Sequence, residues 1–272
     1  PAHEVGLEPM DEIVKVNDEV VLGWNINDVV KMLRGEPGTN VTVWVRREGH
    51  DELLRFDITR ELIKIESVSQ KRLTNDIAYI RIKHFTQKTA EEMLSALKVA
   101  GETKARGLVL DLRNNPGGLL DASVAVADYF LDGGEIVSIR GRVDKANEIF
   151  TAKPGTAFDG PMAVLINEGS ASASEIVAGA LKDRERAVLV GEKSFGKGSV
   201  QTLFRLPDGS GLFVTIAKYY TPSGAMIDGV GVEPDIVVEG KYTGKLDDDE
   251  QLKRAIKEVE TLLVKVPAKT VK

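Results

Sequence analysis

The chain has 272 residues, of which 42% are hydrophobic and 29% are charged, and 36 Lys and Arg against 42 Asp and Glu give a formal net charge of −6. These proportions are typical of an ordinary folded protein and argue against intrinsic disorder. The chain has no block of basic residues, which excludes nucleic acid from the expected partners. The absence of cysteine excludes thiol catalysis and disulfide frameworks. No apolar run is long enough for a membrane span or a signal peptide, and because the first residue is Pro1, we expect the true N-terminus to lie upstream.

Short strands surround one helix in the first part of the chain. A helix is predicted over Asn27–Arg34, with Asn25 or Asn27 as its N-cap and Gly35 just after its end. Alternation of apolar and polar residues predicts strands at Ile13–Val16, Val20–Leu22, Val41–Val45 and Leu53–Ile58. Residues 1–64 are therefore predicted to form a small α+β module.

Beyond Arg60, strands alternate with helices, which is typical of a mostly parallel α/β sheet with covering helices. The strands are predicted at Ile77–Ile82, Gly107–Leu112, Ile136–Ile139, Met162–Ile166 and Ala187–Val190. The helices are predicted at Thr89–Val99 behind a Thr89/Glu92 capping box, at a segment running through Asp128–Leu131, at Ser174–Leu181 and at Asp247–Val264. Asp208-Gly209 between two alternating runs predicts a hairpin. We assign residues 65–245 to an α/β domain and 246–272 to a C-terminal helical segment.

Two polar segments directly follow apolar strands, at the strand ends where α/β sheets carry functional residues. They are Asn167–Glu175, which holds three serines, and Gly191–Ser199, which holds a lysine between glycines. The second segment matches the glycines and the lysine of a phosphate-binding P-loop. However, Gly198 stands where that motif needs a hydroxyl, and a strand follows where it needs a helix, so nucleotide binding is disfavoured. His3, His50 and His84 have no spacing that suggests a metal pair or a catalytic triad.

Ser172 has two interpretations. Ser172-x-x-Glu175 is a formal capping box, and a helix cap needs no catalytic role. In the second interpretation Ser172 is a nucleophile at a helix N-terminus, where backbone N–H groups and the helix dipole favour developing negative charge. Lys197 and the Pro116-Gly117-Gly118 turn are expected at the same sheet edge, and a desolvated lysine can act as general base. A serine-lysine dyad fits this pattern, and both interpretations stay open.

Four motifs together carry a family resemblance. They are Asn167–Ile176, Gly196–Gln201, Asp111–Gly118 and Gly231–Asp235, and they resemble those of the carboxyl-terminal processing, or tail-specific, serine proteases. The Asp11–Arg60 module is similar to the PDZ domain of these proteases, and residues 65–245 are similar to their serine protease core, which has a ClpP/crotonase-like fold.

The resemblance implies roles for individual residues. Ser172 corresponds to the nucleophile, Lys197 to its base and Gln201 to the glutamine that orients the lysine, on the strand face of Lys197 and Ser199. The oxyanion donors correspond to the backbone N–H groups of Ala173 and of Gly117 or Gly118. Asp183 matches a supporting aspartate, and a solvated charge at a helix end is the alternative.

The activity implied is that of a serine endopeptidase that cleaves protein or peptide substrates near accessible C-terminal tails through an acyl-enzyme. No metal or organic cofactor is implied. The resemblance places the protein outside the cytoplasm, in the periplasm or cell envelope, and leaves room for a homo-oligomer. The alternative is a non-catalytic ligand-binding or PDZ scaffold protein on the same fold, which has no reason to keep Ser172, Lys197 and Gln201 together.

The PDZ-like module departs from the family pattern at its start. It begins at the equivalent of the first short helix, Ala2–Gly6, so we expect the N-terminal strand and the carboxylate-binding loop to be absent. Because a PDZ groove binds a peptide along that strand, we expect this module to bind C-terminal peptides poorly.

Overall fold

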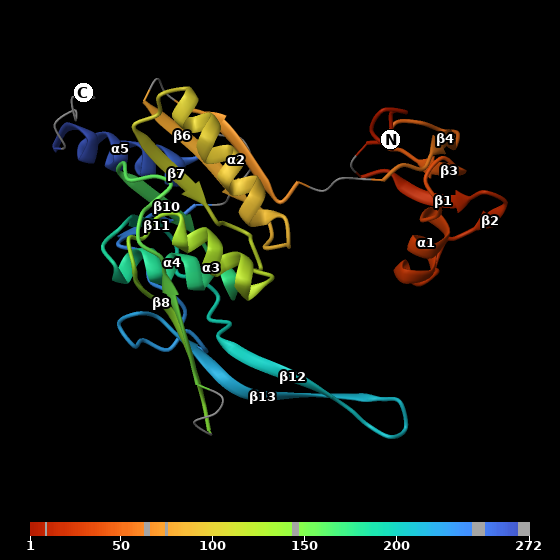
Figure 1. Ribbon diagram of the computed structural model, residues 1–272. Helices are drawn as coiled ribbons and strands as arrows, with labels where there is room; N and C mark the ends of the chain where they lie inside the picture. Colours follow the sequence, from red (N-terminus) through yellow and green to blue (C-terminus); the bar gives the residue numbers. More distant parts are fainter. Residues whose placement is uncertain (9, 63–65, 74–75, 143–146, 241–247, 266–272) are drawn as a thin grey trace. The chain divides into compact units, whose positions relative to one another are not determined.

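The computed structural model describes residues 1–8, 10–62, 66–73, 76–142, 147–240 and 248–265. The chain divides into two compact units, Pro1–Ile65 and Glu66–Lys272 (Figure 1). Each unit has its own hydrophobic core.

The N-terminal unit is an antiparallel sheet with one helix. Its strands lie in the order β2-β1-β3-β4 and span Glu12–Val16 (β1), Glu19–Val20 (β2), Asn40–Arg46 (β3) and Leu54–Thr59 (β4). Alternate valines of β3 (Val41, Val43 and Val45) are buried with Val29 of helix α1, Ile26–Leu33. The side-chain oxygen of Asn25 accepts a hydrogen bond from the backbone N–H of Asn27 at 2.9 Å, so Asn25 is the N-cap of α1.

The larger unit is built on a six-stranded sheet with the strand order β14-β11-β10-β7-β6-β5. The strands span Val68–Arg72 (β5), Ile77–Ile82 (β6), Gly107–Asp111 (β7), Met162–Ile166 (β10), Val188–Gly191 (β11) and Ile236–Val237 (β14). All neighbouring pairs are parallel except β5 and β6. The carboxyl ends of β7, β10 and β11 therefore meet at one edge of the sheet.

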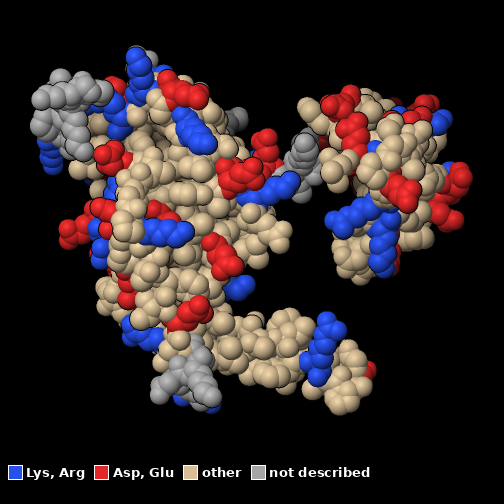
Figure 2. Space-filling model, in the orientation of Figure 1, with Lys and Arg blue, Asp and Glu red and all other residues tan. Residues whose placement is uncertain are grey.

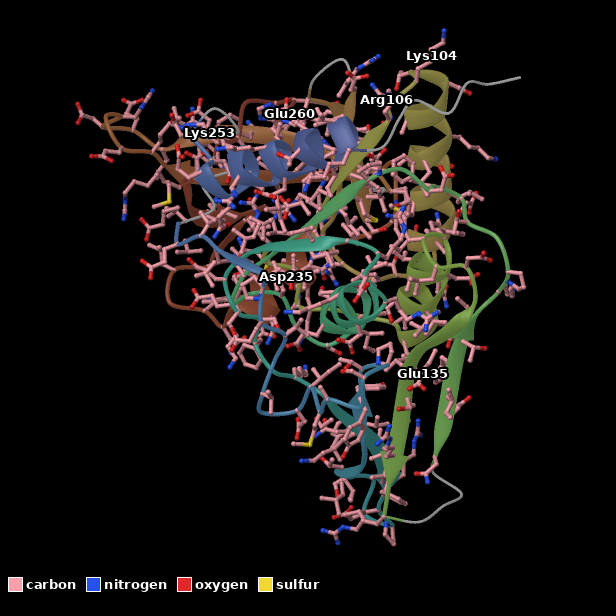
Figure 3. The ribbon with its side chains drawn as sticks, turned by 90° about the vertical axis from the view of Figure 1, so that its left-hand side faces the viewer. Lys104, Arg106, Glu135, Asp235, Lys253 and Glu260 are labelled. Carbon is pink, nitrogen blue, oxygen red and sulfur yellow. The ribbon has the colours of Figure 1, made fainter. Side chains whose placement is uncertain are left out.

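Helices cover both faces of this sheet (Figures 1 and 3). Helices α2 (Thr89–Glu102), α3 (Leu120–Asp128) and α4 (Ala173–Asp183) pack on one face, and α5 (Glu250–Lys265) packs on the other. Leu108 and Leu110 of β7 contribute to the first core, whereas Val109 is buried with Ala255 and Val259 of α5. Central strands buried on both faces explain the continuous apolar runs in the sequence.

A second sheet has the strand order β12-β13-β8-β9. Its strands span Gly134–Gly141 (β8), Glu148–Ala152 (β9), Ser199–Arg205 (β12) and Gly211–Tyr220 (β13). Within the described residues, β13 pairs with β8 only through its Ala217–Tyr220 end. The rest of the β12–β13 hairpin is therefore two-stranded. Figure 2 shows this hairpin as mostly uncharged, and its exposed apolar side chains include Leu203, Phe204, Leu212 and Phe213.

The predicted fold class is confirmed: a mostly parallel sheet with covering helices is accompanied by a small antiparallel module. The predicted Asp208-Gly209 hairpin is also present, as β12 and β13. None of the described helices combines the length and the apolar character that a membrane span requires.

Several local predictions were wrong. Lys88 is the N-cap of α2, so Thr89 and Glu92 form no capping box. Glu92 instead accepts hydrogen bonds from the backbone N–H groups of Ser67 at 2.8 Å and Val68 at 3.1 Å, and so attaches the start of β5 to the helix. Helix α3 ends at Asp128 because the chain turns there and buries Phe130 in the core. Strands β5, β9 and β14 were not predicted, since short and largely polar segments give a weak alternation signal.

Candidate active site

Ser172 lies where β10 leads into α4. Residues 167–172, the β10–α4 turn, separate the two elements, and Ser172 is the N-cap of the helix. Its φ of 56° and ψ of −113° fall outside the usual regions for an L side chain, at a cost of about 1–3 kcal/mol. The turn is tied to the neighbouring β7 end by the Ser170 hydroxyl, which donates to the Leu112 carbonyl at 2.8 Å. These contacts hold a strained backbone at the carboxyl edge of the sheet.

Two of the predicted oxyanion donors, the backbone N–H groups of Ala173 and Gly118, have no acceptor in the described part of the chain. The Ala173 N–H belongs to the first turn of α4, where the helix itself provides no acceptor. Gly117 packs against the same turn, since a Cβ on it would lie 2.7 Å from the Ala171 carbonyl oxygen and 2.9 Å from the Ala173 nitrogen. The Gly117 N–H is used by the side chain of Asn115, at 2.9 Å. Among the described residues neither Ala173 nor Gly118 has an acceptor for its N–H, so the geometry favours Gly118 over Gly117 as the second donor.

Asn115 holds the glycines next to the serine. It lies in residues 112–119, the β7–α3 loop, and its carbonyl accepts from the Ala171 N–H at 3.0 Å and from the Ser174 hydroxyl at 2.9 Å. Its side-chain amide donates to the Ile82 carbonyl at 2.9 Å. Since Asn115 is fully buried, both sets of bonds are shielded from water. The β7–α3 loop and the β10–α4 turn are therefore one hydrogen-bonded structure.

Glu175 links the candidate nucleophile to the lysine segment. Its carboxylate is fully buried and accepts from the backbone N–H of Ser172 at 2.7 Å and of Lys197 at 2.8 Å, both at the same oxygen. The other oxygen accepts from the Ser194 hydroxyl and from the Gly196 N–H, each at 2.6 Å. The capping box noted in the sequence is therefore only part of the role of Glu175, because three of its four donors come from residues 192–198, the β11–β12 loop.

Lys197 lies in the β11–β12 loop with its backbone fixed by Glu175. Its side chain is exposed and forms no hydrogen bond with the Ser172 hydroxyl, although both residues belong to the described part of the chain. The structure therefore brings the two backbones together but leaves the amine and the hydroxyl separate.

Gln201 and Asp183 make contacts other than those expected. Gln201 lies on β12, where its amide is 3.5 Å from the Thr215 hydroxyl, and it forms no hydrogen bond with Lys197, which precedes the strand. Asp183 is the last residue of α4, at the end of the helix opposite to Ser172, and accepts from the Ser223 N–H at 2.9 Å. The structure thus does not bring either side chain to Ser172, and their roles stay predictions.

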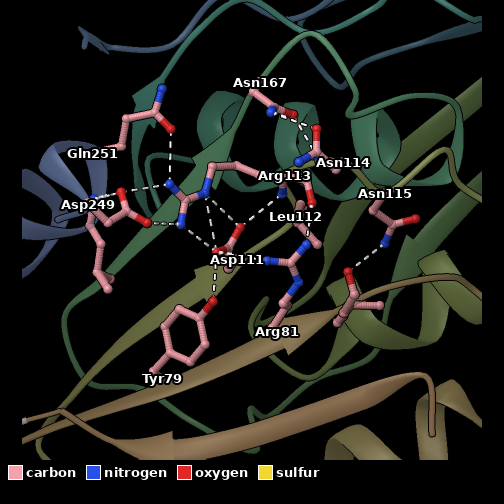
Figure 4. A network of polar contacts seen from close by, with 12 residues as sticks. Tyr79, Arg81, Asp111, Leu112, Arg113, Asn114, Asn115, Asn167, Asp249 and Gln251 are labelled. Carbon is pink, nitrogen blue, oxygen red and sulfur yellow. Dashed lines mark hydrogen bonds and ion pairs between the residues drawn. The ribbon is translucent and has the colours of Figure 1, made fainter. Parts of the chain in front are cut away.

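A network of buried charged side chains is centred on Arg113 of the β7–α3 loop (Figure 4). The fully buried Arg113 guanidinium donates to Asp111 at 2.7 Å and to Asp249 at 2.8 Å. Burial opposes its charge, but the hydrogen bonds that it donates to these two carboxylates outweigh burial and hold the pKa of Arg113 above its ordinary value. The Tyr79 hydroxyl donates to Asp111 at 2.7 Å.

Sequence reasoning did not identify Asn115, Arg113 or Asp249 as site residues. The available signal was the Asp111-Leu112-Arg113-Asn114-Asn115 run, which places polar side chains directly after a fully apolar strand. Within the described residues, no group of three or more His, Asp or Glu side chains is placed to hold a metal ion.

Comparison with known proteins adds evidence that is independent of this geometry. The family model of peptidase family S41 matches residues 76–238, which include Ser172 and Lys197, and a PDZ domain model matches residues 1–47. A carboxy-terminal-processing protease of Bartonella bacilliformis is 48% identical over 255 residues, covering 90% of this chain and 58% of that protein. A carboxyl-terminal-processing protease of Synechocystis sp. is 42% identical over 243 residues, covering 88% of this chain and 57% of its own length.

The solved structure of the photosystem II D1 C-terminal processing protease superposes with a TM-score of 0.61 and 35% identity. The match covers 88% of this chain and 65% of that one. The chain thus spans a little over half of the length of the two curated relatives. Because the family model matches more than half of the chain and includes the Ser172 and Lys197 segments, the chain belongs to peptidase family S41.

Proposed function

We propose that this chain is a serine endopeptidase that cleaves protein substrates near their C-termini. The observation that carries the proposal is the Glu175 carboxylate, one oxygen of which accepts from both the Ser172 and the Lys197 backbone N–H. A carboxylate that only capped a helix would not need to accept a hydrogen bond from the segment that holds Lys197. The names of the two curated relatives, both carboxyl-terminal-processing proteases, support the same activity and the preference for C-terminal tails.

In the proposed first step, the Ser172 hydroxyl attacks the carbonyl carbon of the scissile peptide bond. The neutral Lys197 amine takes the hydroxyl proton, and the carbonyl oxygen becomes an oxyanion that accepts from the Ala173 and Gly118 N–H groups. Lys197 then gives the proton to the leaving amine. The products are an ester between Ser172 and the N-terminal part of the substrate, and a free C-terminal fragment.

Water completes the proposed cycle. Lys197 takes a proton from the water that attacks the ester carbonyl, the same two N–H groups bind the second oxyanion, and the proton returns to the Ser172 oxygen as the acid leaves. No redox step or organic cofactor takes part in this sequence.

The Lys197 side chain has to turn toward Ser172 before the first step. Its backbone is already held next to the Ser172 backbone by Glu175, so only rotations of its flexible side chain are needed. Catalytic hydrogen bonds often form only when substrate binds, so the lack of one between Ser172 and Lys197 here is compatible with this mechanism. The location outside the cytoplasm and the homo-oligomer stay predictions from the resemblance.

The test measures degradation of unfolded casein by the whole chain and by three variants. Ser172→Ala removes the nucleophile, and Lys197→Arg keeps a positive charge that cannot accept the proton, so we expect both to lose about 10³-fold or more of the activity. Lys193→Ala is the matched control. Lys193 lies in the same β11–β12 loop but pairs with the exposed Glu233 at 2.7 Å, so this variant should keep near-normal activity.

A fluorophosphonate probe tests the nucleophile directly. The wild-type chain should gain the mass of one phosphonyl group, and Ser172→Ala should gain none. A folded wild-type chain that neither cleaves casein nor reacts with the probe would contradict the proposal and favour a non-catalytic binding protein on the same fold.

A further inference from the structure

The start of α5 is joined to the β7–α3 loop by Arg113. One guanidinium nitrogen donates to Asp249 Oδ1 at 2.9 Å and to Gln251 Oε1 at 3.0 Å, and the other donates to Asp249 Oδ2 at 2.8 Å and to Asp111 Oδ2 at 2.7 Å. Arg113, Asp111, Asp249 and Gln251 are all buried (Figure 4). The contact joins segments more than a hundred residues apart in the chain, so it forms only when α5 is docked on the sheet.

Asp249 fixes α5 and Arg113 with one carboxylate. Its Oδ1 also accepts from the Leu252 N–H at 2.9 Å, in the first turn of the helix. Gln251 adds a second attachment, because its amide donates to the Val238 carbonyl at 2.8 Å, just beyond β14. The end of β14, the start of α5 and the guanidinium are thus held together.

Asp249 is one of two carboxylates that pair with the Arg113 guanidinium among the described residues. In the described part of the chain, the charged groups around it include Asp111, Asp249 and Arg81, which lies 3.8 Å from the Asp111 carboxylate and donates to the Arg113 carbonyl at 3.2 Å. The fully buried Arg113 guanidinium and the partly buried Arg81 guanidinium therefore both lie beside the buried Asp111 carboxylate, and Asp249 is the second carboxylate at Arg113. Removing the charge of Asp249 takes one of these two carboxylates away from a fully buried guanidinium, which is unfavourable unless the loop moves.

The β7–α3 loop transmits the position of Arg113 to the oxyanion donors. Arg113 precedes Asn115 by two residues, and Asn115 binds the Gly117 N–H through its side chain and the β10–α4 turn through its carbonyl. The loop between these two anchors is short. A shift of Arg113 should therefore displace Gly117 and Gly118 relative to Ser172.

We propose that Asp249 and Gln251 are positioning residues for the oxyanion donors, so that docking of α5 on Arg113 sets the place of the Gly118 N–H. This inference rests on the proposed peptidase function of the Ser172 site. It makes α5, which lies on the opposite face of the sheet from α4, part of the machinery that binds the transition state. The groups displaced by loss of this contact bind the oxyanion and not the ground-state substrate, so turnover should fall while substrate binding stays constant.

The experiment compares Asp249→Asn with wild type in the full chain, using a fluorogenic peptide substrate. We expect kcat to fall by about 10–100-fold, as for a weakened oxyanion donor, with KM unchanged within about twofold. A peptide aldehyde forms a hemiacetal whose oxygen occupies the oxyanion position, and its affinity should fall by the same factor as kcat. Glu250→Gln is the control, since Glu250 is the exposed neighbour and pairs only with Lys253 at 2.7 Å among the contacts described. An Asp249→Asn variant with wild-type kcat, or one in which KM rises and kcat does not fall, would overturn the inference.

Hydrogen exchange provides a readout that needs no activity. The Gly117 N–H donates to Asn115 in the structure, so its exchange should be faster in Asp249→Asn than in wild type while amides of β10 keep their protection. Unchanged exchange at Gly117 would overturn the inference even if activity were lost. If the wild-type chain cleaves nothing, the proposed function fails, but this measurement still tests the coupling. Gln251→Met, which keeps Asp249, serves if Asp249→Asn does not fold; a several-fold lower kcat supports the inference and an unchanged kcat contradicts it.

Discussion

The Glu175 carboxylate receives four hydrogen bonds, and they come from both sides of the candidate site. Ser172 contributes one N–H from the turn before α4, while the Ser194 hydroxyl and the Gly196 and Lys197 N–H groups come from the β11–β12 loop. A carboxylate has acceptors only, which suits a position where every neighbour is a donor. This side chain therefore holds the β10–α4 turn and the β11–β12 loop together.

Replacing Glu175 by Gln should separate the two halves of the site. One of the two oxygens becomes an NH₂ group that faces N–H or O–H donors, and the charge is lost, so we expect the free energy of unfolding to fall by about 2 kcal/mol. Peptidase activity should fall at least tenfold, by about 1.4 kcal/mol or more in the barrier. Both are measured on the full chain, by urea unfolding followed by circular dichroism and by casein degradation. Glu168→Gln is the control, because Glu168 is an exposed carboxylate in the same β10–α4 turn; an equal loss in both variants would contradict the prediction.

The elements of the fold begin and end where local chemistry requires. Helix α1 shows this, because Asn25 and Asn27 were equal candidates for the N-cap and only Asn25 has its side chain in position to accept a backbone N–H. Val29 is the one buried residue of the helix, and Met32 and Leu33 are only partly buried against the same core. The Asn25 cap should contribute measurably to the free energy of unfolding of this unit.

Asn25→Ala should lower the free energy of unfolding of the N-terminal unit by about 1 kcal/mol. Asn27→Ala should change it by less than about 0.5 kcal/mol, since Asn27 is exposed and donates through its backbone. Tryptophan fluorescence during urea unfolding measures both, because Trp24 and Trp44 are the two tryptophans of the chain and both lie in this unit. A larger effect for Asn27→Ala than for Asn25→Ala would show that the assignment of the cap is wrong.

At the scale of the whole molecule, each of the two units contains an arginine–aspartate ion pair, and the two pairs differ in depth. In the larger unit, Arg113 is paired deep in the interior. In the N-terminal unit, Arg47 donates to Asp11 at 2.7 Å and 2.8 Å near the surface. The hydrogen bonds from Arg47, together with one from the Glu8 N–H, lower the pKa of Asp11 from its ordinary value of 3.8 to about 2.

Acid should therefore weaken the N-terminal unit in a defined window. A carboxyl group whose pKa is lower in the folded than in the unfolded state stabilises the fold above its unfolded pKa, and this contribution disappears as the pH falls through the folded pKa. The difference in unfolding free energy between wild type and Asp11→Asn should be constant above about pH 5 and shrink between about pH 4 and pH 2. Tryptophan fluorescence is again the measurement. A difference that is independent of pH would contradict the assignment.

The elements of this chain could largely be predicted from sequence because their signals are local. Apolar runs predicted β6, β7 and β10, and Asp208-Gly209 predicted the β12–β13 hairpin. The mostly parallel sheet also followed from the alternation of strands and helices. However, Ile136–Ile139, predicted among its strands, belongs to β8 of the second, antiparallel sheet. The resemblance of four motifs to the tail-specific proteases predicted the family that the comparisons then showed.

Only the tertiary structure decided which groups meet. Ser172-x-x-Glu175 has the spacing of a local cap, and nothing in that spacing shows that the β11–β12 loop supplies three more donors. Gly117 and Gly118 are equivalent in sequence, and they differ because the Asn115 side chain takes the N–H of Gly117 alone. The contact of Arg113 with Asp249 exists only after the sheet has formed and α5 has docked on it. Periodicity and turn chemistry act over a few residues and can be read from the sequence, whereas the partners of a buried charge are set by the assembly of distant segments.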